Sequence, residues 1–252
     1  MRPFAVVALA LAALPLHPIA QRPPREAAVP FTIGETLTYD VAWSAYLVAG
    51  TAVATVAEKR PALDGTAYYI VADGRPAPLL SRLYNLAYKM DTLLDSYTLL
   101  PHRGSVYIEE GTNRHLAVTR FDRTAHTASF EVQDDPTFTA AFEVPPQVQD
   151  GLSALYVLRA MTFKPGDRLA LPVTDEGALY RLQMDVGASE RVSVPLGSID
   201  AWNVKASILD AQGEPAMDNV TIWISTDTRR LPVKLEAGLP VGTFVLSLRD
   251  VR

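Results

Sequence analysis

Hydrophobic and polar residues alternate one by one along most of this chain. The pattern is clearest in residues 37–43, 180–186, 220–225 and 244–249, where large apolar residues occupy every second position. Because successive side chains of a β-strand point to opposite faces, each segment predicts a strand with one apolar face. Weaker forms of the pattern predict further strands near residues 47–58, 66–73, 86–95, 103–110, 114–121, 126–132, 167–174, 190–195 and 201–210, and another that begins around Leu231.

Turn residues separate these segments at short intervals. Asp64-Gly65, Glu110-Gly111 and Glu176-Gly177 are acid–glycine pairs of the kind that tight turns use. Since helical segments do not alternate with the strands, an antiparallel sheet is favoured over βαβ units. A sheet of about ten or more strands curls, splits or closes. The prediction is an all-β (mainly β) fold: a large, strongly curved antiparallel sheet, or an open β-barrel or β-spiral, with one or two short helices.

Two segments have helical spacing instead. In Pro78–Tyr84 the leucines fall three and four positions apart. In Asp150–Met161 the apolar residues, Leu152 and Tyr156 among them, lie on one side. The aspartate that opens the second segment is placed to cap the helix N-terminus. Both segments are short, so they interrupt the sheet rather than form a layer of their own.

The first twenty residues have the layout of a secretory signal peptide. Arg2 supplies a positive charge, and Phe4–Leu16 is an apolar run. At about 1.5 Å per residue the run spans about 20 Å, less than a hydrocarbon core of about 30 Å. Cleavage after Ala20 fits the small residues there, and an uncleaved membrane anchor is the alternative. No later segment approaches about 18 continuous apolar residues, so we expect a mature chain that does not span a membrane.

The rest of the chain is expected to form one domain. Gln21–Pro30 carries three prolines and three charges, which is typical of a tether. Residues 31–252 then form a single β-rich domain, without internal repeats or low-complexity tracts. The proline-bounded stretch Asp134–Pro146 is expected to be a loop. A division of the sheet into two lobes near residues 134–150 stays open.

Composition and charge exclude several classes of protein. The 252 residues include 23 Lys and Arg against 28 Asp and Glu, a formal net charge of -5, which excludes a nucleic-acid binder that works through a basic surface. Hydrophobic residues make up 48% and charged residues 20%, values of a globular chain. There is no cysteine, hence no disulfide, thiolate metal site, cysteine nucleophile or lipid-anchored cysteine. Together with the N-terminus this predicts an exported, periplasmic protein stabilised by its core alone.

Candidate catalytic chemistry is sparse. His102, His115 and His126 match no zinc-ligand spacing, and the chain contains no nucleophile elbow, dinucleotide fingerprint or phosphate loop. Asp175 and Glu176 are neighbours beside a turn, where adjacent side chains diverge, so solvated turn acids are expected rather than a catalytic pair. We therefore expect no catalytic residue, no metal and no cofactor.

Three other acids stand beside aromatic or turn residues. Glu35 and Asp40 lie among aromatics on the first strand, where carboxylates with a shifted pKa are sometimes functional. Glu35 also starts that strand, a position where a structural hydrogen bond is equally natural. Asp227 and Arg229 are expected to close a turn as an ion pair.

Aromatic residues give the only candidate ligand site. Tyr39 and Trp43 share one face of the first strand, while Trp223 lies on the face opposite Ile222. A strand that is apolar on both faces is buried on both or lines a cavity. A sheet that closes tightly has a packed core, and one that closes widely leaves a cavity for an apolar ligand. The candidate ligand-binding residues are Tyr39, Trp43, Tyr156, Trp202 and Trp223.

Several segments resemble a known family. They are, in order, Phe31–Tyr39 with Trp43 and Ala49-Gly50, then Asp150–Arg159, Trp223–Val233 and Gly242–Leu248. In type and order they resemble a family of bacterial exported proteins known as domain of unknown function 3108. The resemblance covers about residues 30–252. It implies an envelope protein of Gram-negative-type bacteria, with a β-rich fold similar to the open, curved sheets of lipoprotein-localisation carriers and periplasmic β-spirals. It implies no activity and no catalytic residues.

The same motifs have plain structural roles. Leu152, Leu155 and Tyr156 make an apolar helix face that would plug one opening of the curled sheet. Arg159, on that helix, is expected to pair with an acid such as Asp150 or with strand carbonyls.

Two functional hypotheses follow, with a third behind them. The first is a non-enzymatic periplasmic protein whose curved sheet holds an apolar ligand, such as a lipid or an acyl chain. The second is a structural or protein-interaction module of the envelope, with a packed core and a surface for another envelope protein. An enzyme acting on an envelope glycan is the third, because no nucleophile, base or metal set supports it.

Overall fold

The computed structural model describes residues 25–252 except 44–46, 63–64, 79–85, 134–136 and 240–241. Within these residues it contains one antiparallel sheet and one helix, and no helix long and apolar enough to cross a membrane. The strands are β1 (Thr36–Trp43), β2 (Leu47–Ala62), β3 (Gly65–Pro76), β4 (Leu86–Asp95), β5 (Pro101–Glu110), β6 (Asn113–Asp122), β7 (Thr127–Val132), β8 (Phe138–Glu143), β9 (Gln149–Asp150), β10 (Arg168–Asp175), β11 (Ala178–Val194), β12 (Gly197–Leu209), β13 (Pro215–Ser225), β14 (Pro232–Leu239) and β15 (Gly242–Val251).

The sheet has a simple order. All fifteen strands belong to it, and neighbours in space run β8 to β1 and then β15 to β9. The first strand therefore pairs with the last, for example Leu37 with Val251 and Val41 with Leu246. All pairs are antiparallel apart from β9 with β10. This confirms the predicted all-β fold with a large antiparallel sheet.

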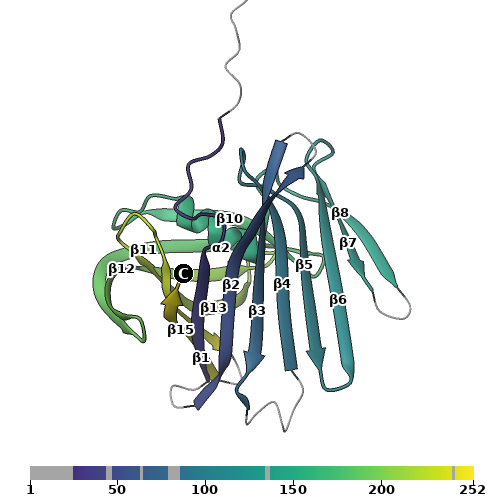
Figure 1. Cartoon of the computed structure of the whole chain (residues 1–252). Coiled ribbons are helices and arrows are strands. Elements are labelled where there is room, and N and C mark those ends of the chain that lie inside the picture. The colour runs from purple at the N-terminus through teal and green to yellow at the C-terminus, as the bar shows by residue number, and fades with distance from the viewer. Residues whose placement is uncertain (1–24, 44–46, 63–64, 79–85, 134–136, 240–241) are drawn as a thin grey trace, which may run out of the picture.

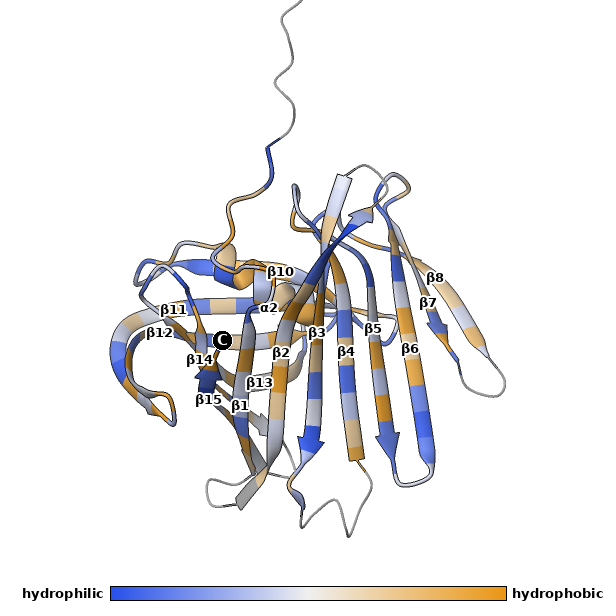
Figure 2. Ribbon diagram, in the orientation of Figure 1, coloured by the Kyte–Doolittle hydropathy of each residue, from blue (hydrophilic) through white to orange (hydrophobic). Residues whose placement is uncertain are grey.

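The sheet is strongly curved and open. Figure 1 shows β1 to β6 side by side, with β11 to β13 crossing behind them at a steep angle and the helix between the two sets. Along the strands apolar and polar bands alternate, as the sequence predicts (Figure 2). The curl follows from burial on one side, because the sheet wraps around the face that packs against the helix.

The helix α2 (Gly151–Ala160) begins where the sequence predicts. Asp150 is its N-cap: Oδ1 accepts from the backbone N–H groups of Leu152 at 3.0 Å and Ser153 at 2.9 Å. The Ser153 hydroxyl in turn bonds to the backbone N–H of Asp150 at 2.9 Å, which completes a capping box. The other predicted helix, Pro78–Tyr84, lies outside the described residues apart from its proline.

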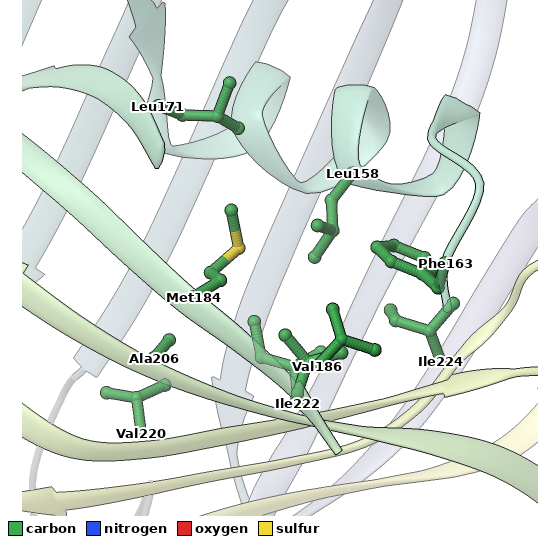
Figure 3. Packing of buried hydrophobic residues seen from close by; sticks show 10 residues of the cluster. Leu158, Phe163, Leu171, Met184, Val186, Ala206, Val220, Ile222 and Ile224 are labelled. Atoms are coloured by element: carbon green, nitrogen blue, oxygen red, sulfur yellow. The ribbon is translucent and has the colours of Figure 1, made fainter. Parts of the chain in front are cut away.

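Helix α2 fills the space between the two halves of the sheet. On one side Leu152 and Tyr156 pack against β2 to β4, where Ile70 is fully buried. On the other side Leu158 packs against β10 to β13, including Met184 (Figure 3). The interior is thus a packed core with the helix at its centre.

A second core lies under the curled end of the β11–β12 hairpin. It includes Tyr39, Val192, Trp223 and Leu248. The sequence predicts two strands in this region, at 180–186 and 190–195, but β11 is one long strand whose register shifts between Val186 and Ser189. The bulge bends the strand without ending it, and it breaks the alternation that the prediction relies on.

The stretch Asp134–Pro146 is not only a loop. It contains β8, which pairs with β7 in regular antiparallel register from Phe138–Val132 to Glu143–Thr127. The prolines and acids at the ends of this stretch favour a loop, although the five uncharged residues in the middle form a strand. The sequence pattern therefore does not predict β8.

The end of the expected tether is docked on the sheet. The Glu26 carboxylate accepts from Lys59 Nζ at 2.6 Å and from the hydroxyls of Thr66 and Ser96 at 2.9 and 3.1 Å. The Ala27 N–H donates to the Ser96 carbonyl at 2.8 Å. Residues from Glu26 onward therefore belong to the fold.

Candidate functional site

Three motifs that are far apart in the sequence meet at a buried ion pair. Arg159, on α2, donates through both terminal nitrogens to the Glu35 carboxylate at 2.6 and 3.0 Å. The Arg159 side chain is fully buried and that of Glu35 is 10% exposed. Bidentate geometry of this kind is the strongest form of an Arg–carboxylate pair.

The turn between β13 and β14 supplies the remaining partners. Arg159 donates from Nε to the carbonyl of Arg230 and from a terminal nitrogen to the carbonyl of Arg229, both at 3.2 Å. Arg159 thus pairs with an acid, as expected, but the acid is Glu35, because the Asp150 carboxylate caps α2. The carbonyls that it contacts belong to a turn and not to a strand, as the prediction had it. Glu35 takes the structural role that its place at a strand start allows. The turn itself contains the predicted ion pair of Asp227 with Arg229, at 3.0 Å.

Aromatic rings close this junction. Phe31 makes edge contacts with Tyr156 and Tyr68, with ring centroids 5.1 and 5.3 Å apart. The Tyr39 hydroxyl donates to the Pro232 carbonyl at 2.9 Å. Burial raises the pKa of Tyr39 and of Tyr156, so both phenols stay neutral. The junction is a closed anchor that ties the first strand, the helix and the β13–β14 turn together.

The five candidate ligand-binding residues do not line a common cavity. Tyr39 and Trp223 share the core under the β11–β12 hairpin, and Trp223 is buried on the face opposite Ile222, as predicted. Tyr156 belongs to the core beside β2 to β4, and Trp202 borders the one beside β10 to β13. Trp43 is 41% exposed and stacks on Phe244 with centroids 6.0 Å apart. Their role in ligand binding stays a prediction.

A large hollow of the described structure lies elsewhere. It has a volume of about 890 Å³ and opens on β3 to β6. We call it the outer hollow, because Asp73, Lys89 and Asp91 occupy strand positions opposite in parity to Ile70 and Thr92, which face α2. Its lining consists of Tyr69, Val71, Ala72, Asp73, Arg75, Pro76, Leu86, Ala87, Lys89, Met90, Asp91, Arg103, Ser105, Tyr107, Glu109 and Leu116.

Charge is the distinguishing property of the outer hollow. Three acids and three bases line it. Asp91 accepts from both Arg103 and Ser105, which neutralises the middle of the surface. Among the described residues the side chains of Asp73, Arg75 and Lys89 make no hydrogen bond or ion pair. The surface therefore offers unpaired charges of both signs around a neutral centre.

Sequence reasoning missed this site. Its only signal is the charges on the polar positions of consecutive strands, Asp73 and Arg75 on one, Lys89 and Asp91 on the next. Charges on the polar face of a strand are ordinary. Only the register, which places Asp73 beside Lys89 and Asp91 beside Ser105, gathers them into one surface.

Two smaller hollows lie elsewhere in the described structure. One, of about 480 Å³, lies near Tyr180 and Gly213. The other, of about 30 Å³, reaches Asp150 from the turn that holds Asp175 and Glu176, both of which are exposed as predicted. No group of three or more His, Cys, Asp or Glu side chains able to hold a metal ion occurs in the described parts of the chain.

Two of the histidines contact separate acids. His102 lies 3.2 Å from Asp95 and His115 lies 3.6 Å from Glu176. The contact of His115 thus joins β6 to the turn between β10 and β11. Asp40, the other acid near the aromatics, accepts from Arg249 at 2.8 Å.

Fold and motifs together define a class: an open, barrel-like antiparallel sheet curled around the anchored helix α2. The family described as "Protein of unknown function (DUF3108)" matches residues 38–249, and the chain belongs to this family. The expected family resemblance is thereby confirmed. A search of curated proteins found no match to this chain.

One solved structure shares the architecture. A β-barrel-like protein of domain of unknown function DUF1849 from Brucella abortus is similar with a TM-score of 0.54 and 9% identity, over 87% of this chain and 97% of the other. At this identity the likeness concerns the fold alone. A protein with a YmcC-like fold from Bacteroides fragilis matches with a TM-score of 0.33 and 10% identity, over 90% of this chain and 100% of the other.

Proposed function

We propose that the chain is a non-enzymatic binding module of the bacterial cell envelope that holds an extended, charged polypeptide segment of another envelope protein in the outer hollow. Export rests on the signal-peptide layout of the first twenty residues. The binding role rests on one observation, the volume of about 890 Å³ lined by unpaired charges of both signs.

The chemistry of the outer hollow favours a polar polymer. Asp73, Arg75 and Lys89 are free to pair, so a segment with alternating charges would gain ion pairs that the free protein lacks. Tyr69 and Tyr107 add flat, amphipathic surface of the kind that is enriched at interfaces. The hollow is open along the sheet, which suits an extended chain better than a compact small molecule.

An apolar ligand in the interior has less support. Such a ligand needs a cavity between the halves of the sheet, and the side chains of Leu152, Tyr156 and Leu158 fill that space. Native mass spectrometry of residues 21–252, purified without detergent, tests this alternative. Lipid adducts that vanish on denaturation would favour it over the polypeptide, because the helix would then have to move aside.

The binding proposal is tested by reversing the free cations. Arg75→Glu combined with Lys89→Glu changes the outer hollow, and Lys205→Glu changes an exposed cation of β12 as the matched control. A photo-reactive phenylalanine analogue at Tyr107 should cross-link one envelope protein in the native host. Because each rim charge contributes about 0.5 kcal/mol, the double variant should lower the yield at least about fivefold, and the control should not.

Three results would contradict the binding proposal. The double variant would cross-link as well as the unmodified chain, the Lys205→Glu control would lose as much, or an analogue at Trp43, outside the hollow, would give the same adduct. The yield should also fall with rising salt, because exposed charges are screened within about 10 Å at 0.1 M.

A further inference from the structure

One long edge of the sheet is open. The order of strands ends at β8 on one side and at β9 on the other. β9 consists of two buried residues and continues directly into α2, so it offers no edge. β8 has six residues, and within the described parts of the chain it pairs only with β7 (Figure 1). An unpaired strand of this kind is a template for another strand.

The register shows which groups of β8 point outward. The Val144 N–H donates to the His126 carbonyl at 2.9 Å, and these two residues lie opposite each other in the β7–β8 register. Hydrogen-bonded pairs alternate along an antiparallel ladder, so the even-numbered residues of β8 bond to β7. The N–H and C=O groups of Thr139 and Ala141 therefore point away from the sheet.

β8 lacks the usual protection of an edge strand. From Phe138 to Phe142 it contains no charge and no proline, and its register with β7 has no bulge. Phe138 is 58% exposed, the highest value among the large apolar side chains of the described structure. Charges, prolines or bulges protect natural edge strands of this length from pairing with other chains, unless the strands are already paired or covered.

We propose that β8 is the interface of a homodimer in which two copies pair antiparallel, with Ala140 opposite Ala140 of the second copy. In this register Thr139 exchanges hydrogen bonds with Ala141 of the second copy, which uses the outward groups. Phe138 then faces Phe142 of the second copy in a non-hydrogen-bonded pair, where cross-strand side chains approach most closely.

The self-pairing register has two advantages that the sequence of β8 supplies. It covers the exposed Phe138 twice, once on each copy, because the strand carries an aromatic at both ends of the same face. It also keeps the only charge, Glu143, at the end of the ladder and away from Glu143 of the second copy, so no like charges oppose each other. The strand is thus complementary to itself, as a two-fold interface requires.

The first test is the mass in solution. Native mass spectrometry and light scattering of residues 21–252 should show a dimer. Ala141→Pro should give a monomer, because proline removes an N–H that points outward and leaves the β7 ladder intact. Ala141→Thr keeps the N–H and should remain a dimer. Circular dichroism and the melting temperature check that both variants fold.

The second test reads the register. The natural chain has no cysteine, so single cysteines report unambiguously. Ala140→Cys places two thiols on opposed residues about 4.5 Å apart at Cα, within disulfide range, and should form a covalent dimer on mild oxidation. Ala141→Cys, its neighbour, faces Thr139 of the second copy and should not.

Each contrary outcome overturns the dimer. A monomeric natural chain at micromolar concentration, a dimer that survives Ala141→Pro, or a cross-link from Ala141→Cys in place of Ala140→Cys would each do so. A monomer that binds a different protein through Ala141-sensitive pairing would assign the edge to that protein instead. None of these results depends on the outer hollow, since Arg75 and Lys89 lie on other strands.

Discussion

At the scale of single residues, Arg159 connects parts of the fold that are far apart in the sequence. Its guanidinium joins Glu35 before the first strand to two carbonyls of the β13–β14 turn. Removing one member of a buried pair leaves the other charge buried without a partner, which costs far more than the net contribution of the pair. Arginine is suited to this position because its five donors are fixed in a plane and serve three acceptors at once.

We expect Arg159→Met to lower the free energy of unfolding by about 3–5 kcal/mol. Arg249→Met, which breaks the exposed pair with Asp40, should cost about 0–1 kcal/mol and is the control. The double variant Glu35→Gln, Arg159→Met should recover part of the loss, because no charge is then left unpaired. Urea unfolding followed by tryptophan fluorescence measures all of them, and a loss below about 1 kcal/mol for Arg159→Met would refute the anchor.

The N-cap of α2 gives a pH-dependent prediction at the same scale. Burial raises the pKa of Asp150 above its usual value, although hydrogen bonds from Thr92 and Ser153 oppose the shift. A raised carboxyl pKa means that the folded state holds the proton more tightly. This group therefore favours folding below its ordinary pKa of about 3.9, and that contribution is lost as the pH rises through the folded value.

Asp150→Asn keeps a capping acceptor and removes the buried charge. Relative to the natural chain it should become more stable as the pH is raised from 4 to 7. Asp150→Ala, which loses the cap, should cost about 1 kcal/mol throughout. Unfolding curves at both pH values give the comparison, and a natural chain that gains on the asparagine variant with rising pH would reverse the sign and exclude the proposed cause.

At the scale of elements, the sequence predicts local structure well and long-range partners poorly. Alternation locates β4 and β6 almost residue by residue, and Asp150 marks the start of α2, because these signals lie within the elements themselves. The predictions for β11 and β8 are wrong for a related reason. The extra residue of the β11 bulge and the prolines that flank β8 interrupt the alternation of apolar and polar residues.

The contacts between side chains that are far apart in the sequence depend on the fold and not on local patterns. Arg159 bonds to Glu35 across 124 positions, a pairing that depends on how the sheet curls and not on any local pattern. The outer hollow likewise depends on register, which sets Asp73 beside Lys89. The aromatic residues predicted as ligand contacts are ambiguous for another reason, because a large apolar side chain on a two-faced strand can either pack in a core or line a cavity. Trp223 is an example, because it packs in the core under the β11–β12 hairpin.

At the scale of the whole molecule, the pairing of β1 with β15 makes one sheet from two halves. The Thr36 and Arg252 backbones exchange hydrogen bonds of 2.9 and 3.0 Å at the end of this ladder. The halves also share α2, which packs against both. The chain passes from one half of the sheet to the other near residues 134–150, while the β1–β15 ladder joins the same halves on the opposite side. Whether the halves are separate lobes therefore depends on whether they unfold cooperatively.

We expect the halves to unfold together. Leu248, on β15, is fully buried beside Tyr39, and Leu248→Ala should cost about 2–5 kcal/mol while the transition stays single. Leu196→Ala, at a position 38% exposed, is the control and should cost much less. Fluorescence of the tryptophans reports mainly on the C-terminal half, and hydrogen exchange of β5 and β6 reports on the N-terminal half. If fluorescence and hydrogen exchange gave separate transitions, the sheet would consist of two lobes that fold independently. The β1–β15 ladder would then be a contact between two lobes and not part of one cooperative domain.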